Sequence, residues 1–78
     1  MGRLQKRSMR IAGHRTSLAL EVEFWQALEV LARARVQSLP VLIAEIDRER
    51  EKRGGEASLA SAVRVFVLTR PPGSSLGT

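Results

Sequence analysis

The side chains best placed to do chemistry in this sequence are the basic ones near its amino-terminal end. Five of them lie within the first 15 residues: Arg3, Lys6, Arg7, Arg10 and Arg15. That segment contains no Asp or Glu, and the whole chain of 78 residues has a formal net charge of +5, so the rest of the chain is neutral. A cationic segment joined to a neutral body is typical of proteins that bind dense negative charge, and nucleic acid fits this pattern better than a membrane surface.

The other reactive side chains argue against an enzyme. The sequence has one histidine, His14, and no cysteine or tyrosine. His14 lies three residues before Ser17, but no orienting acid lies nearby, so a nucleophilic triad is incomplete. Gly54-Gly55 lacks the preceding strand and the lysine of a phosphate-binding loop. We therefore predict no catalytic residue, no bound metal and no cofactor.

A short strand is predicted over residues 15–20. One face carries Thr16, Leu18 and Leu20, and the other carries Arg15, Ser17 and Ala19. The pattern leaves open whether the strand begins near Met9 or near His14, because Gly13 can start, kink or bulge a strand.

Three helices are predicted after the strand. Apolar residues at helical spacing predict the first over residues 22–35. Ser38 is a suitable N-cap for the second, Pro40 fits its first turn, and Gly54 ends it. Ser58 caps the third, in which the apolar residues from Leu59 to Val67 favour a helix over a strand.

A lone strand leaves backbone groups unpaired, and a chain of this size buries only roughly 60% of its unfolded surface. We therefore predict that the strand pairs antiparallel with the strand of a second copy. The core of this homodimer would contain Leu18, Leu20, Trp25, Leu28, Leu42 and Ile46. The outer faces of the paired strands would form a ribbon that fits the major groove of DNA.

Several blocks of residues resemble a known family over about residues 7–70. They include Gly13-His14-Arg15-Thr16-Ser17, Glu23-Phe24-Trp25 and Arg64-Val65-Phe66. These blocks closely resemble a bacterial subfamily of the ribbon-helix-helix DNA-binding proteins. The resemblance implies a mainly α fold, with one short strand and three helices, that forms an intertwined homodimer. It also implies a sequence-specific transcriptional repressor, or the operator-binding part of an antitoxin, that reads the major groove.

The resemblance also assigns contacts to DNA. Base contacts fall on Arg15, Ser17 and Ala19. Phosphate contacts fall on the start of the second helix, at Ser38 and Leu39. The charge of the basic segment, and not the resemblance, predicts further phosphate contacts at Arg3, Lys6, Arg7 and Arg10. This chain departs from an ideal site at Ala19, which has no hydrogen bond to give, and at Pro40, which removes one backbone amide.

These patterns divide the chain into a basic flexible arm (1–13), a ribbon-helix-helix domain with an extra helix (14–70) and a disordered tail (71–78). The expected partners are double-stranded DNA and a second copy, with a protein partner also considered and no membrane. Because no segment resembles a signal peptide or a membrane span, we expect a cytoplasmic protein. The alternative function is a protein-interaction or antitoxin-like dimerisation module that binds DNA only weakly.

Overall fold

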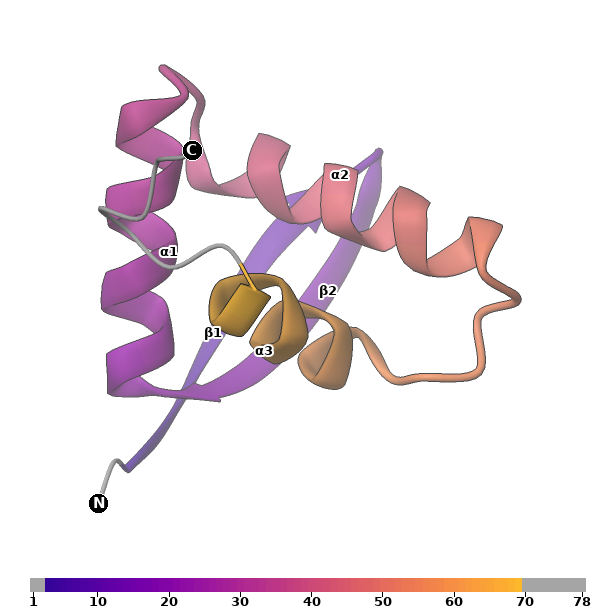
Figure 1. The fold of residues 1–78 in the computed structure, drawn as a ribbon, viewed down its shortest axis with the longest axis horizontal. Helices are drawn as coiled ribbons and strands as arrows, with labels where there is room; N and C mark the ends of the chain where they lie inside the picture. The colour runs from indigo at the N-terminus through magenta and orange to yellow at the C-terminus, as the bar shows by residue number, and fades with distance from the viewer. Residues whose placement is uncertain (1–2, 70–78) are drawn as a thin grey trace.

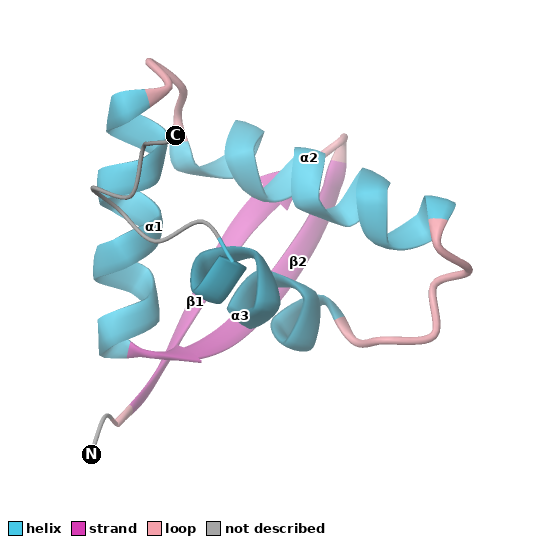
Figure 2. Cartoon of the chain, in the orientation of Figure 1, coloured by secondary structure: helices cyan, strands magenta, loops and turns pink. Residues whose placement is uncertain are grey.

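The structure, a computed structural model, describes residues 3–69. Two strands precede three helices: β1 (Leu4–Ile11), β2 (His14–Glu21), α1 (Val22–Ala34), α2 (Leu39–Lys52) and α3 (Leu59–Thr69). The helices pack against one face of a two-stranded sheet, and in the view of Figures 1 and 2 α2 crosses the sheet and α3 lies in front of it. The tail predicted over residues 71–78 lies outside the described residues.

The strand β2 has its pairing partner within the same chain. It pairs antiparallel with β1, and Ala12 and Gly13 form the two-residue connection. Both connecting residues have positive φ angles, +52° and +85°, as type I′ hairpin turns require. The prediction of a single strand without a partner in its own chain was therefore wrong. Residues 4–11, which we had placed in a basic arm, form the second strand of the ribbon.

The register gives the hairpin two distinct faces. Residues directly opposite one another in an antiparallel pair lie on the same face. Arg7 is opposite Leu18, and Met9 is opposite Thr16, so these residues share the face that packs on the helices. At the turn end of that face Ile11 is 5% exposed. The remaining residues of both strands form the opposite, solvent-exposed face.

The helices follow the predicted amphipathic patterns closely. In α1 the buried residues are Trp25, Leu28 and Ala32, which recur at helical spacing. Ser38 caps α2, and its side-chain oxygen accepts a hydrogen bond from the Val41 amide at 3.4 Å. The segment that could have formed a strand, around Val63–Leu68, is helical as predicted.

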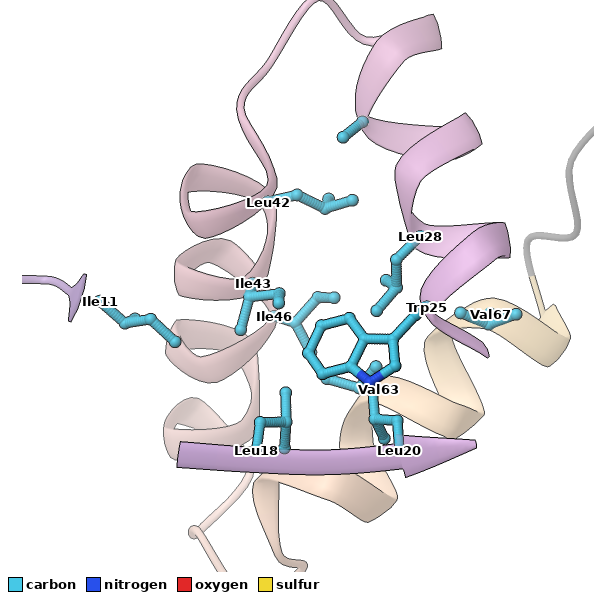
Figure 3. Packing of buried hydrophobic residues seen from close by; sticks show 11 residues of the cluster. Ile11, Leu18, Leu20, Trp25, Leu28, Leu42, Ile43, Ile46, Val63 and Val67 are labelled. Atoms are coloured by element: carbon cyan, nitrogen blue, oxygen red, sulfur yellow. The ribbon is translucent and has the colours of Figure 1, made fainter. Parts of the chain in front are cut away.

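One chain is sufficient to bury the residues that we had predicted to form a dimer core. All six are 5% exposed or less within the single chain: Leu18, Leu20, Trp25, Leu28, Leu42 and Ile46. Figure 3 shows Leu18 and Leu20 pointing from β2 toward Trp25, with Val63 of α3 beside them. The core is thus closed by β1 and α3 of the same chain, which supply Ile11, Val63 and Val67.

Trp25 fixes β1 to the helices. Its indole nitrogen donates a hydrogen bond of 2.8 Å to the backbone oxygen of Gln5. The Arg7 guanidinium lies 4.5 Å from the centre of the Trp25 ring and forms an ion pair of 3.0 Å with Glu29 of α1. A buried indole N–H needs such a partner, so β1 contributes a polar contact to the core as well as apolar surface.

The helices within residues 3–69 include none with the length and apolar character needed to cross a membrane.

Candidate nucleic-acid interface

The exposed face of the hairpin gathers the predicted base-contacting residues with three residues of β1. The face consists of Lys6, Ser8 and Arg10 from β1 and Arg15, Ser17 and Ala19 from β2. We call these six residues the ribbon face. All are exposed except Ala19, which is half-buried. These six residues make the ribbon face basic, and the exposed Leu4 lies opposite Glu21 on the same side of the hairpin at its open end.

The cross-strand pairs of the ribbon face are of the closely spaced kind. In a two-residue hairpin the pair that flanks the turn, here Ile11 and His14, is hydrogen-bonded, and the pair types then alternate. Every pair of the ribbon face is thus of the other type, in which Cα atoms lie about 4.5 Å apart. The side-chain oxygens of Ser8 and Ser17 are accordingly 3.2 Å apart and share a hydrogen bond.

Arg10 lies directly opposite Arg15 at the turn end of the ribbon face. Like charges in this position repel one another and weaken the strand pairing. An anion placed between the two guanidinium groups would remove this repulsion. The arrangement therefore favours a bound polyanion over the free protein.

The cations of the ribbon face lack carboxylate partners. Within residues 3–69, the basic side chains that form ion pairs are Arg7, Arg35, Arg50, Lys52 and Arg64. Lys6, Arg10 and Arg15 are not among them, so their positive charges face solvent without a nearby opposite charge. Such charges bind phosphate at little cost, because no existing ion pair has to be broken.

Arg7 and Arg3 differ from the other predicted phosphate contacts. Arg7 lies on the helix-facing side of β1, where Trp25 and Glu29 hold its side chain. Arg3 precedes β1, and its backbone oxygen accepts a hydrogen bond of 3.1 Å from the Val22 amide. The structure therefore does not bring these two together with Lys6 and Arg10 on one face.

The carboxylate at the open end of the ribbon, that of Glu21, is paired with a cation. Glu21, the last residue of β2, accepts a hydrogen bond of 2.9 Å from Arg64 of α3. This hydrogen bond, with a smaller contribution from the backbone of Glu21, lowers the pKa of the carboxyl group below its ordinary value of 4.5. Glu21 is therefore charged at neutral pH, but its charge is paired with a cation away from Arg10 and Arg15.

The start of α2 offers little to a phosphate. Ser38 uses its hydroxyl to cap the helix by accepting from the Val41 amide, and Pro40 has no amide hydrogen. Of the first three residues of α2, only Leu39 keeps an amide without a partner in the helix or its cap. The predicted phosphate contacts at Ser38 and Leu39 therefore reduce to one backbone donor.

A groove of about 1000 Å³ lies elsewhere, between α2 and α3. Its lining mixes arginines such as Arg48 and Arg53 with the acids Glu45, Glu49 and Glu56. Because side chains of both charge signs line it, this groove does not match a uniformly anionic ligand. The ribbon face is the only part of the described chain where unpaired cations share one strand face.

Sequence reasoning missed the contribution of β1 to this site. The signal was present, since Ala12-Gly13 separates two runs of alternating residues, which is typical of a hairpin. The basic residues of the first run concealed it, because they resembled a solvated arm. Only the strand register shows that Lys6, Ser8 and Arg10 lie on the exposed face of the hairpin.

Comparison with known families agrees with this fold. A family model described as ribbon-helix-helix domain matches residues 4–70, so the chain belongs to the ribbon-helix-helix domain family. Domains of this family generally bind DNA and dimerise, and the fold is not an enzyme fold. Searches of curated proteins and of solved structures give no match.

Proposed function

We propose that this protein is a sequence-specific DNA-binding regulator that inserts its ribbon face into the major groove. The observation that carries the proposal is the ribbon face itself, on which three unpaired cations flank a central pair of serines. A two-stranded ribbon fits the width of the major groove. Membership of the ribbon-helix-helix family supports the same activity.

The side chains of the ribbon face suit direct reading of bases. Arg15 and Arg10 can donate two hydrogen bonds to a guanine, and Ser17 can pair with any base edge. Ala19 can contact the methyl group of a thymine. Lys6, Arg3 and the one free backbone amide at the start of α2, that of Leu39, would hold the flanking phosphates.

We further propose that the protein acts as a repressor in the bacterial cytoplasm. A protein seated in the major groove of a promoter blocks access of the transcription machinery, so binding alone is sufficient for repression. The family's general tendency to dimerise supports a homodimer on DNA. Since each chain closes its own core, this homodimer would be an association of folded chains.

The test compares two double variants that each remove two positive charges. Arg10→Gln with Arg15→Gln removes the arginines of the ribbon face. Arg33→Gln with Arg53→Gln removes two exposed arginines, one in α1 and one directly after α2, that form no ion pair among the described residues. Binding to labelled duplex DNA is measured at several salt concentrations for both variants and for the wild type.

We expect the ribbon variant to lose affinity and its slope of log affinity against log salt to become shallower by about 2, while the control changes neither. The ribbon variant should also unfold at a slightly higher temperature, because the repulsion between opposed arginines is gone. Equal losses in both variants would contradict the proposal. Such a result would favour the alternative of a protein-interaction module that binds DNA only weakly.

A further inference from the structure

We infer that the exposed face of α3 binds the same face of a second copy of this chain. This face consists of Ser61, Val65 and Leu68, and we call it the outer face of α3. The contact uses no residue of the ribbon face, so it goes beyond the proposed function. It follows from where the exposed apolar side chains lie, from the charge pairing on α3 and from the mixed charges of the groove beside it.

The helix α3 exposes two large apolar side chains on one face. Val65 is 51% exposed and Leu68 is 69% exposed. Residues three apart in a helix are neighbours on its surface, so these two side chains form one apolar patch. The other exposed large apolar side chains within residues 3–69 lie one to a segment, at Leu4, Val30, Val36 and Val41. Among the helices that the structure describes, α3 is thus the one in which such side chains adjoin.

The outer face of α3 carries no charge. Arg64 is the single ionisable residue of α3, and its guanidinium forms an ion pair of 2.9 Å with Glu21. When a surface meets a copy of itself around a two-fold axis, a charge near the axis comes close to the same charge of the other copy. Like charges at short distance repel one another. The outer face of α3 can meet its own copy without this repulsion.

The groove between α2 and α3 adjoins the outer face of α3, because Ser61 and Val65 line it. Its lining also includes the bases Arg48 and Arg53 and the acid Glu56, none of which forms an ion pair within residues 3–69. A surface with free charges of both signs is complementary to itself, since a two-fold rotation can bring an acid of one copy to a base of the other. These charges therefore favour a second copy over a partner of uniform charge.

Antiparallel packing of two α3 helices fits the side chains of the outer face. Val65 is the middle residue of the face, so it lies nearest the two-fold axis and meets Val65 of the second copy. Ser61 then adjoins Leu68 of the second copy, and a small residue faces a large one on both sides of the axis. Because Ser61 also lines the groove of about 1000 Å³, the leucine side chain has space to enter.

The contact adds to the dimerisation that is general in the family. The family's description names a ribbon and two helices, and α3 is the third helix of this chain. Copies that are already paired in the family's general way can be joined further through α3. A contact centred on two apolar side chains from each copy is small, so it is weak and forms at high protein concentration.

The first experiment compares Val65→Asp with Val30→Asp. Each variant places one carboxylate at an exposed valine in the middle of a helix, but Val30 lies on α1, outside the outer face of α3. Sedimentation equilibrium from micromolar to millimolar concentration measures the mass, and circular dichroism checks the fold. The wild type and Val30→Asp should gain mass at the upper concentrations. In Val65→Asp this association should weaken at least about tenfold, because two carboxylates meet near the axis.

The second experiment places a single thiol near the proposed axis and needs no charged substitution. The natural chain has no cysteine, so Val65→Cys and Val30→Cys each introduce one thiol. At concentrations where the wild type associates, Val65→Cys should form a disulfide between chains about tenfold faster than Val30→Cys, because association raises the effective concentration of its thiols. Equal rates of disulfide formation, or equal masses of Val65→Asp and the wild type at every concentration, would overturn the inference.

Binding to a short DNA duplex separates this inference from the proposed function. Val65→Asp and Val30→Asp have the same net charge and should bind the duplex equally well. If Val65→Asp lost a binding activity that Val30→Asp kept, the α3 contact would be part of the DNA-binding assembly, and the inference of an additional contact would be overturned. If no variant and no wild-type protein bound duplex DNA, the proposed function would fail, and the masses and disulfide rates would still decide the contact.

Discussion

At the scale of single residues, two helices of this protein end in the same way but with different residues. The amide of Gln37 donates to the oxygen of Ala32 at 2.9 Å, and the amide of Gly55 donates to the oxygen of Arg50 at 3.0 Å. Both are Schellman endings, in which the preceding residue is left-handed. That residue is Gly54 after α2, with φ of +102°, but Val36 after α1, with φ of +55°.

We predict that Val36→Gly stabilises the protein by about 1 kcal/mol. A β-branched residue in the left-handed region is strained by on the order of 1–3 kcal/mol, of which the added flexibility of glycine offsets a part. Val36 is 92% exposed, so the substitution removes no packing. Urea unfolding of the variant should show a higher midpoint.

Gly54→Val is the matched comparison for this prediction. A Cβ at Gly54 would meet no atom within 4 Å, so only the φ angle opposes a side chain there. This variant should be destabilised by about as much as Val36→Gly is stabilised. If Val36→Gly lowered the midpoint instead, the strain at Val36 would not be the dominant effect.

At the scale of elements, the hairpin is both the proposed reading surface and one wall of the core. Its exposed face carries Arg10 and Arg15, and its other face carries Leu18 and Leu20. The residues proposed to contact DNA are separate from those that pack in the core, because successive side chains of a strand point to opposite faces. A substitution on the ribbon face can therefore alter DNA binding without opening the core.

We predict that deletion of residues 1–8 unfolds the protein or destabilises it severely, although a flexible arm could have been removed without effect. The deletion removes most of β1, exposes Leu18 and Leu20 and leaves the Trp25 indole without its acceptor at Gln5. The unsatisfied donor alone costs about 1–3 kcal/mol. Circular dichroism during thermal unfolding measures the loss.

The control for this deletion is Arg3→Gln with Lys6→Gln, which removes two charges but keeps the strand. Both side chains are exposed, so stability should stay within about 0.5 kcal/mol of the wild type. A deletion that melted like this control would show that β1 is dispensable for folding.

At the scale of the whole molecule, the core is complete in one chain. Its buried residues come from both strands and all three helices. The sequence argument for an obligate dimer assumed that β2 had no partner in the chain, and that assumption fails because β1 pairs with it. Burial of the core residues therefore does not require a second chain.

We predict that the midpoint of thermal unfolding is independent of protein concentration over about a hundredfold range. If folding required a second chain, the same range would stabilise the native state by about 2.7 kcal/mol through mass action, and the midpoint would rise. Differential scanning calorimetry at several concentrations distinguishes the two. A rising midpoint would show that the homodimer forms as the chain folds.

The sequence by itself determined the helices, the exposed face of β2 and the family. The spacing of Trp25, Leu28 and Ala32 defines α1, because helical periodicity is a local property that needs no knowledge of neighbours. Ser38 marks the start of α2 for the same reason, since capping depends on a few adjacent residues. The faces of β2, with Arg15 and Ser17 on one side, follow from simple alternation.

Only the tertiary structure decided which strand pairs with β2. The basic residues of β1 were read as an arm, because net charge describes a segment without its register. Whether the partner strand comes from the same chain depends on a long-range balance, in which the Ala12-Gly13 turn, the Trp25 contact with Gln5 and the burial of Ile11 act together. None of these is visible in a local pattern, and together they turn Lys6, Ser8 and Arg10 into half of the ribbon face.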